Sequence, residues 1–469
     1  MIENMKKLLF IALFLLFTLY SNGQETKFPQ TELIMDLDSL VSFIEQVHPN
    51  PYANISKNEI YRDIKRAKKS MPDSVSLIKF FTIISPVVSK LKDGHTGVLF
   101  PYREWKSMNP FCFPFNPQIS FEGKLFASDR QSSLPKGAEI LSINDIPSIH
   151  IFTMLLSSIN GESEKWRISL LNQSFVERFG VFYGFDSIYK IKYKLEDKTD
   201  TLTIQGYRLK DLLELKRKEQ KKKETQNIVQ IRPYSFKILA DKTGLIDFKE
   251  FSGEAQFPGF LDSIFSVMSK EKTKNLIIDL RDNGGGNSIL GDELFQYISK
   301  VPFSQAGKTI TKYSNIQSQF YEKHRKSGNF SFLTDLSESE FNTLVSHKPG
   351  SIVILEDTLI PLRENKYRFS GNVYVLASIN SFSSASMFAW CFHKFNMGVI
   401  VGEETGGYIV SFGDIIYSVL PKSNLNMTIS TKELYLYGTT DNDRHGVLPD
   451  YQVKPDDALD FTLKLINKE

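Results

Sequence analysis

The first part of the chain carries apolar residues at helical spacing. Between residues 31 and 91 they recur three or four positions apart, as in Leu37, Leu40, Val41 and Ile44, and the same spacing returns in residues 77–91. Such spacing lines one face of an α-helix with apolar side chains. Prolines interrupt the pattern at positions 49, 51 and 72. The segment is therefore predicted to fold as a small helical domain.

The pattern changes twice further along the chain. Residues 118–207 contain short β-type runs, and residues 136–145 (KGAEILSIND) are typical of a turn, a strand and a tight polar turn. Beyond Pro233 strands and helices alternate, which predicts an α/β core built of βαβ units. The strands expected there are 274–280, 372–377 and 399–402, and the helices are 288–299 and 384–396.

The first 23 residues are typical of an export signal. Two lysines precede a run, residues 8–20, that is apolar except for Thr18, and small residues precede a cleavage point before Gln24. The run is short for a membrane span, which needs about 20 residues. The mature protein is expected to start at Gln24, in the periplasm or outside the cell, with no stable membrane span. A retained N-terminal anchor is the alternative.

Composition and charge exclude several classes of protein. With 469 residues, 41% hydrophobic and 24% charged, the chain is globular and not intrinsically disordered. The net charge is +3, and residues 207–224, with eight basic and four acidic side chains, contribute +4 of it, so the rest sums to −1. Nucleic acid is therefore not an expected partner, and this stretch is predicted to be a solvated helix or linker. Two cysteines, Cys112 and Cys391, are too few for a disulfide scaffold, and whether they pair stays open.

Two strand-to-helix junctions carry candidate chemistry. Residues 279–288 (DLRDNGGGNS) place three glycines after a buried strand, where backbone N–H groups can converge on an anion. The nucleotide-binding spacings of glycine and lysine are missing. Residues 378–390 (SINSFSSASMFAW) place several serines at the start of a helix, whose positive end favours a developing alkoxide or oxyanion. Serines are also common helix caps, so this cluster alone leaves both interpretations open.

Six short motifs follow one another in a familiar order. They are residues 93–96 (DGHT), 137–145 (GAEILSIND), 279–286 (DLRDNGGG), 381–386 (SFSSAS), 402–407 (GEETGG) and 446–450 (GVLPD). In this order they resemble the C-terminal-processing (tail-specific) serine peptidases, which include the tricorn core protease. The resemblance covers about residues 30 to 460. It implies a ClpP/crotonase-like α/β core, a PDZ-like domain and hydrolysis of peptide bonds near free C-termini.

The resemblance also implies a nucleophile and a base. The family's Ser-Ala-Ser-Ala-Ser-Glu phrase falls on residues 382–387 and puts the nucleophile at Ser384, with Ser383 and Ser386 as alternatives. The lysine that serves the tail-specific branch is missing, because Thr405 is followed by Gly-Gly-Tyr. This departure favours the branch, like tricorn, in which a histidine is the base, and His95 matches that position.

The other site residues implied by the resemblance are an acid and an oxyanion hole. Asp443 falls on the position where the family has Glu, and Glu404 is its competitor for orienting the base. The backbone N–H groups of Gly285 and Ala385 would form the oxyanion hole, with Gly286 as the alternative.

The predicted protein is an exported serine endopeptidase acting on peptide or protein substrates, with no cofactor and no metal, since no HExxH or Cys/His cluster is present. The PDZ-like module would capture substrate tails by strand addition, or would only cap or gate the site. A non-hydrolytic peptide-binding member is the alternative, and the export signal argues against acyl-CoA chemistry. The expected segments are 1–23 signal peptide, 24–100 helical domain, 117–206 PDZ-like domain, 207–232 charged linker and 233–469 peptidase core.

Overall fold

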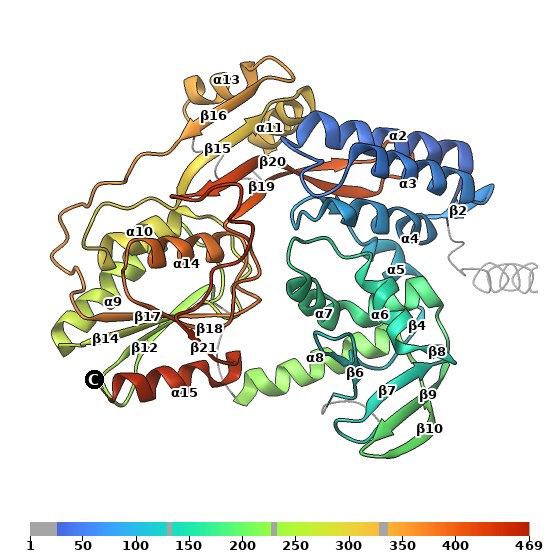
Figure 1. Ribbon diagram of the computed structural model, residues 1–469, viewed down its shortest axis with the longest axis horizontal. Coiled ribbons are helices and arrows are strands. Elements are labelled where there is room, and N and C mark those ends of the chain that lie inside the picture. Colours follow the sequence, from blue (N-terminus) through green and yellow to red (C-terminus); the bar gives the residue numbers. More distant parts are fainter. Residues whose placement is uncertain (1–25, 129–133, 227–231, 328–335, 469) are drawn as a thin grey trace, which may run out of the picture.

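The computed structural model describes residues 26–128, 134–226, 232–327 and 336–468, which form a mixed α/β structure (Figure 1). The predicted export signal, residues 1–23, lies outside this part of the chain. Among the described residues, no helix combines the length and the apolar character that a membrane crossing requires.

A six-stranded sheet forms the core of the C-terminal half. Its order is β12 (Tyr234–Ile238), β13 (Gly244–Phe248), β14 (Asn275–Asp279), β17 (Asn372–Ala377), β18 (Val399–Gly402) and β21 (Tyr451–Gln452). Only β12 runs antiparallel to its neighbour; the other pairs are parallel. The strands expected from the sequence at β14, β17 and β18 are confirmed. Because both faces of such a sheet are covered, the middle residues of these strands are apolar and buried.

Helices cover both faces of this sheet. One face is covered by α9 (Phe257–Glu271), α10 (Ile289–Ile298) and α14 (Ser384–Lys394), and the other by α15 (Pro455–Ile466) (Figure 1). The predicted helices at α10 and α14 are confirmed. The loops that follow β14 and β17 at the carboxyl ends of these parallel strands therefore lie side by side, as such edges require.

A second sheet joins the core to the N-terminal helices. Its order is β16 (Ile352–Glu356), β15 (Ala306–Lys312), β20 (Asn426–Leu436) and β19 (Val410–Val419), and β20 also pairs with β3 (Gly97–Val98). In Figure 1 the long β19–β20 hairpin reaches from the core to the helices α2 and α3. Apolar side chains of the hairpin, among them Ile416 and Ile429, belong to the same buried cluster as Leu37 and Leu40.

The N-terminal segment is helical, as its apolar spacing predicted. It contains β1 (Lys27–Pro29), α2 (Gln30–Val47), α3 (Lys57–Ser70), β2 (Ser74–Ser76), α4 (Leu77–Val88) and the short 3-10 helix η1 (Ser89–Leu91). The side chains of Ser56 and Ser76 cap α3 and α4 by accepting a bond from a backbone N–H. Two further helices, α11 (Asn315–Ser327) and α13 (Glu338–Ser346), lie beside β15 and β16.

The segment between the helices and the core is less purely β than the sequence indicated. Its antiparallel sheet has the order β10 (Lys198–Gln205), β9 (Ile188–Leu195), β7 (Glu139–Ile143), β6 (Leu125–Phe126) and β5 (Gln118–Ile119), with β8 (Ile146–Pro147) paired to β7. Asn144 and Asp145 both have positive φ, which confirms the tight polar turn expected there.

Two helices in this segment were not expected. They are α6 (Ser148–Leu156) and α7 (Glu164–Tyr183), and they pack on the sheet through side chains such as Ile151, Leu171 and Phe175.

The remaining elements are α5 (Tyr102–Met108), β4 (Phe111–Cys112), β11 (Tyr207–Arg208) and α8 (Leu209–Gln226). The charged stretch is thus mostly helix α8. Cys112 and Cys391 are both buried and free.

Candidate active site

The loop that carries His95 follows η1 and leads into β3. Pairing of Gly97 with Thr428 fixes the end of this loop to β20. Its start turns sharply, because Lys92 has a φ of 52°. The carboxylate of Asp93 accepts the backbone N–H of His95 at 2.8 Å, which holds the loop closed. The imidazole is thereby presented to the core while the backbone stays attached to the second sheet.

The serine-rich turn lies between β17 and α14. Three of its hydroxyls are used to hold the turn in place: Ser381 donates to the carbonyl of Leu280 at 2.7 Å, Ser384 to that of Gly286 at 2.6 Å and Ser386 to that of Ser381 at 2.9 Å. Ser383 differs, since its Oγ lies 3.3 Å from Nε2 of His95. The hydroxyl that faces the imidazole is therefore that of Ser383.

The backbone of Ser383 is unusual for a serine. It has φ 53° and ψ −122° and stands immediately before the first residue of α14. A residue other than glycine rarely adopts positive φ, and holding it there costs of order 1–3 kcal/mol. This strained strand-to-helix turn projects the side chain out of the fold, as a nucleophile needs.

The expected pairing of Ser384 with His95 is not what the structure brings together. Ser384 is the first residue of α14, and its hydroxyl ties the helix start to the glycine loop. The physical reason is the direction of the turn: the reversal of φ at Ser383 points that side chain to the imidazole and turns the next one inward. Ser386, the other alternative, is buried and bonded within its own turn.

The glycine loop after β14 lies against the same turn. A methyl group on Gly285 would lie 2.7 Å from Cβ of Ser383 and 3.0 Å from the amide nitrogen of Ser384, so only glycine fits. The buried side chain of Asn283 holds the loop by accepting the Gly285 N–H and donating to the Phe248 carbonyl.

The amides expected to form the oxyanion hole are occupied. Gly285 donates to the side chain of Asn283 at 2.8 Å, and Ala385 donates to the carbonyl of Phe382 at 3.0 Å. The amides of Gly286 and Ser384 have no acceptor among the described residues. Ser384 is at the first position of a helix, where the N–H has no partner within the helix. These two N–H groups, one from each loop, are candidate donors for an oxyanion at Ser383.

The imidazole of His95 is packed between aromatic and charged groups. Its ring stacks on Phe382 at 5.0 Å, and Phe382 stacks in turn on Trp166 at 3.9 Å. Burial lowers the pKa of His95 below its ordinary value, although the charges of Asp93 and Asp414 and the carbonyl of Phe412 act in the opposite direction. The ring is therefore neutral at pH 7 and able to accept a proton.

Asp93, in the same loop as His95, has an almost wholly buried carboxylate. One carboxylate oxygen lies 3.9 Å from Nδ1 of His95, and the other accepts bonds from Ser430 at 2.7 Å and from Nε2 of His48 at 3.1 Å. Nδ1 of His48 accepts the N–H of Asn50, so the ring proton is at Nε2. Burial raises the pKa of Asp93, but the bond to His48 and the charges of both histidines outweigh it, and the pKa lies well below its usual range.

The two carboxylates proposed from the sequence as partners of the base lie elsewhere. Asp443 is only partly buried, and its carboxylate accepts bonds from the backbone and hydroxyl of Thr440, within its own turn. Glu404 accepts the N–H of Gly446 at 3.0 Å. The structure thus brings Asp93, rather than Asp443 or Glu404, beside His95.

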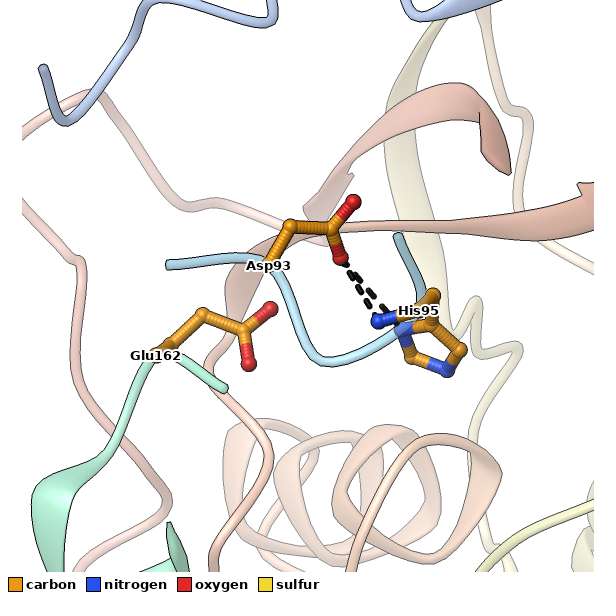
Figure 2. A group of neighbouring side chains, drawn as sticks. All are labelled: Asp93, His95 and Glu162. Carbon is orange, nitrogen blue, oxygen red and sulfur yellow. Dashed lines mark hydrogen bonds and ion pairs between the residues drawn. The ribbon is translucent and has the colours of Figure 1, made fainter. Parts of the chain in front are cut away.

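A second carboxyl group also reaches this loop. Glu162 lies just before α7, in the segment that carries the antiparallel sheet, and its side chain points toward the loop of Asp93 and His95 (Figure 2). Its two oxygens are inaccessible to solvent and make no well-formed hydrogen bond with a described residue. Burial and the charge of Asp93 raise the pKa of Glu162 to about 8, although the amides of Glu162 and Gly94 partly offset this.

Four residues of this site, Ser383, Asp93, His48 and Glu162, were not given their roles by the sequence motifs. Ser383 was only an alternative, and the signal for it is the strained turn, which a motif does not encode. His48 lies in none of the six motifs, although it contacts Asp93 45 positions further along the chain. Glu162 lies in a segment with no recognisable motif. His48 and Glu162 are recognised as part of the site only because they lie close to Asp93 in the folded chain.

Comparison with known proteins supports the class of this protein. The fold and the site define a serine-type peptidase. Residues 242–453 match the model of peptidase family S41. A search of curated proteins finds no match.

Solved structures show the same fold at low sequence identity. Two structures of mature CPAF, one complexed with lactacystin, are each 14% identical, with a TM-score of 0.61 over 94% of this chain and 98% of that chain. A CPAF mutant is 13% identical, with a TM-score of 0.60 over 92% of this chain and 94% of that chain. The likeness therefore extends over nearly the whole chain and is a likeness of fold.

Proposed function

We propose that this peptidase cleaves peptide bonds with Ser383 as nucleophile and His95 as general base. The observation that carries the proposal is the 3.3 Å contact between Oγ of Ser383 and Nε2 of His95, made at a strained turn. Nucleophile and base must lie within hydrogen-bond reach, and this distance in the free enzyme is within the range that tightens on substrate binding.

The reaction follows from the positions of these groups. The Ser383 hydroxyl gives its proton to Nε2 of His95 as its oxygen bonds to the substrate carbonyl carbon. The amides of Gly286 and Ser384 donate to the negative oxygen that forms. His95 then passes the proton to the leaving amine, the C–N bond breaks, and an acyl-enzyme remains. A water molecule, deprotonated by the same imidazole, hydrolyses the acyl-enzyme and frees Ser383.

Asp93 is the acid of the site in this proposal. Its charge lies 3.9 Å from Nδ1 and favours the imidazolium that forms during each transfer. It also favours a proton on Nδ1, which leaves the lone pair of Nε2 free to act as base. His48 holds Asp93 in place from the opposite side.

The remaining features of the proposed protein concern its substrates and location. We infer an exported endopeptidase, on the basis of residues 1–23, with a ClpP/crotonase-like core at 233–469. Residues 24–100 are its N-terminal helical domain and 117–206 its PDZ-like domain. The antiparallel sheet and the helices α6 and α7 support a module that takes an extended peptide by strand addition. The contact of Trp166 with Phe382 joins this module to the nucleophile turn.

A fluorophosphonate probe tests the proposed nucleophile directly. The wild-type protein should be labelled, and peptide mapping should find the adduct on Ser383. Ser383→Ala should abolish labelling, whereas Ser384→Ala should keep it. An adduct on Ser384, or the absence of labelling in a folded wild-type protein, would refute the assignment.

The pH dependence of activity tests the base. Since burial lowers the pKa of His95, the base is deprotonated already below its ordinary value of about 6.5, and activity is lost as the pH falls through that pKa. We expect kcat/KM on a peptide without titrating groups to rise to half its plateau below about pH 6.5. Glu162, with a pKa of about 8, stays neutral throughout this rise. An ascending limb centred above pH 7, or one that survives in an active His95→Gln, would contradict the assignment.

A further inference from the structure

Three potential metal ligands from two distant segments converge behind the imidazole of His95. They are Asp93, His95 and Glu162, and one ligand atom from each lies within 4.8 Å of the other two (Figure 2). Asp93 and His95 share one loop, and Glu162 approaches it from the start of α7. The three residues do not form a known metal-binding sequence motif, which explains why the sequence indicated no metal.

Two of these three side chains have polar atoms without a hydrogen-bond partner among the described residues. Nδ1 of His95 and both oxygens of Glu162 are inaccessible to solvent and make no well-formed hydrogen bond with a described residue. Buried polar atoms are normally bonded, and an unpaired one often marks a missing ion or water. Asp93 adds a buried carboxylate whose Oδ1 lies 3.9 Å from Nδ1. Two neighbouring carboxyl groups disfavour each other's ionisation, and a cation bound between them offsets that repulsion.

We propose that this cluster binds Zn²⁺ and that the bound ion inhibits the enzyme. Zinc takes imidazole nitrogen and carboxylate oxygen at about 2.0–2.2 Å, commonly three protein ligands with water in the fourth position. Ligand atoms on such an ion are about 3.4 Å apart, so the cluster has to contract, which the terminal torsions of Glu162 allow. The contraction draws Glu162 toward Nδ1 and leaves the Ser383 side of the ring unchanged.

Inhibition follows from which nitrogen the ion takes. Nε2 faces Ser383, so the ion binds Nδ1. A metal on Nδ1 occupies the lone pair of that nitrogen, and the ring proton then sits on Nε2. Nε2 becomes a donor to Ser383 and cannot take its proton. Zinc therefore lowers kcat and leaves KM nearly unchanged, because the peptide site in front of Ser383 stays open. Metal binding is independent of the proposed function, whereas the inhibition rests on it.

Binding is measured first on a protein that does not turn over. Ser383→Ala is titrated with Co²⁺ and with Zn²⁺, by visible absorption and by calorimetry. We expect one ion per chain, with binding weakened at least about tenfold when Glu162→Gln is added. Glu164→Gln, an exposed carboxylate two positions along, is the matched control and should bind as the parent does. The absence of saturable binding, or equal binding in both variants, overturns the proposal.

Inhibition is measured next on the active enzyme after removal of metals with a chelator. Zinc should lower kcat reversibly, and Glu162→Gln should raise the half-inhibiting concentration at least about tenfold relative to Glu164→Gln, each variant being compared with its own rate without metal. Competitive inhibition, or a chelated enzyme that needs zinc for activity, overturns the inhibitory role. If probe labelling of Ser383 fails while Co²⁺ still binds, the proposed function fails and the metal site stands.

Discussion

Ser383→Ala should lower kcat by about 10⁴-fold to 10⁶-fold while the protein remains folded, because no other hydroxyl faces the base among the described residues. Ser383 also sits at strained backbone, and alanine shares its backbone preferences, so the substitution removes the oxygen with little change in the turn. Initial rates on a fluorogenic peptide, with a thermal melt of each variant, measure the effect.

Ser384→Ala is the matched control for this prediction. It removes the hydrogen bond to the Gly286 carbonyl, which should cost about 1 kcal/mol of folding free energy and only a modest part of the rate. The double variant Ser383→Ala/His95→Ala should have a kcat only slightly lower than that of Ser383→Ala alone, since both residues serve one step. The opposite order of effects, with Ser384→Ala inactive and Ser383→Ala active, would return the nucleophile to Ser384.

Asp93→Asn should lower kcat by about 10³-fold. Two opposite charges 4 Å apart attract by about 4 kcal/mol at an effective dielectric constant near 20, and each 1.4 kcal/mol changes a rate about tenfold. The 3.9 Å separation of Asp93 and His95 falls at this distance, and the neutral amide removes the attraction for the imidazolium. Steady-state kinetics should show the loss in kcat, with KM little changed.

Asp443→Asn tests the competing assignment. The carboxylate is bonded to Thr440 within its own turn and not to His95, so the variant should keep nearly the wild-type rate. Because Asp93 also holds His48, circular dichroism and a thermal melt of Asp93→Asn must show a folded protein before its rate is interpreted. A large loss in Asp443→Asn, with a near-normal Asp93→Asn, would show that the loop of Asp443 closes onto the base when substrate binds.

Local patterns were sufficient to predict the core. The uninterrupted apolar runs at β14 and β17 are required by a sheet that is covered on both faces, so their secondary structure is encoded in a few adjacent residues. The helix α7 was missed although Leu171, Phe175 and Phe179 have helical spacing, because short β-type runs on both sides dominated the interpretation.

The site depended on information that short motifs do not hold. The motif containing Ser383 and Ser384 locates the turn, but which hydroxyl faces outward is decided by the sign of one backbone angle. The carboxylate that lies beside His95 also differs from the expected one. Asp443 occupies the expected place in the sequence, yet its carboxylate is used by Thr440, and the carboxylate beside the imidazole is two residues from His95 itself.

His95 and Ser383 are separated by 288 positions, one in the N-terminal half of the chain and one in the C-terminal half. A contact between such distant segments has a large entropic cost of loop closure, so we expect it to form late in folding. During synthesis, a chain that has emerged only as far as the helices or the antiparallel sheet carries the base without the nucleophile. If Ser383 and His95 form the catalytic pair, hydrolysis can begin only once the C-terminal half has folded against the N-terminal half, and an incomplete chain cannot cleave its neighbours or itself.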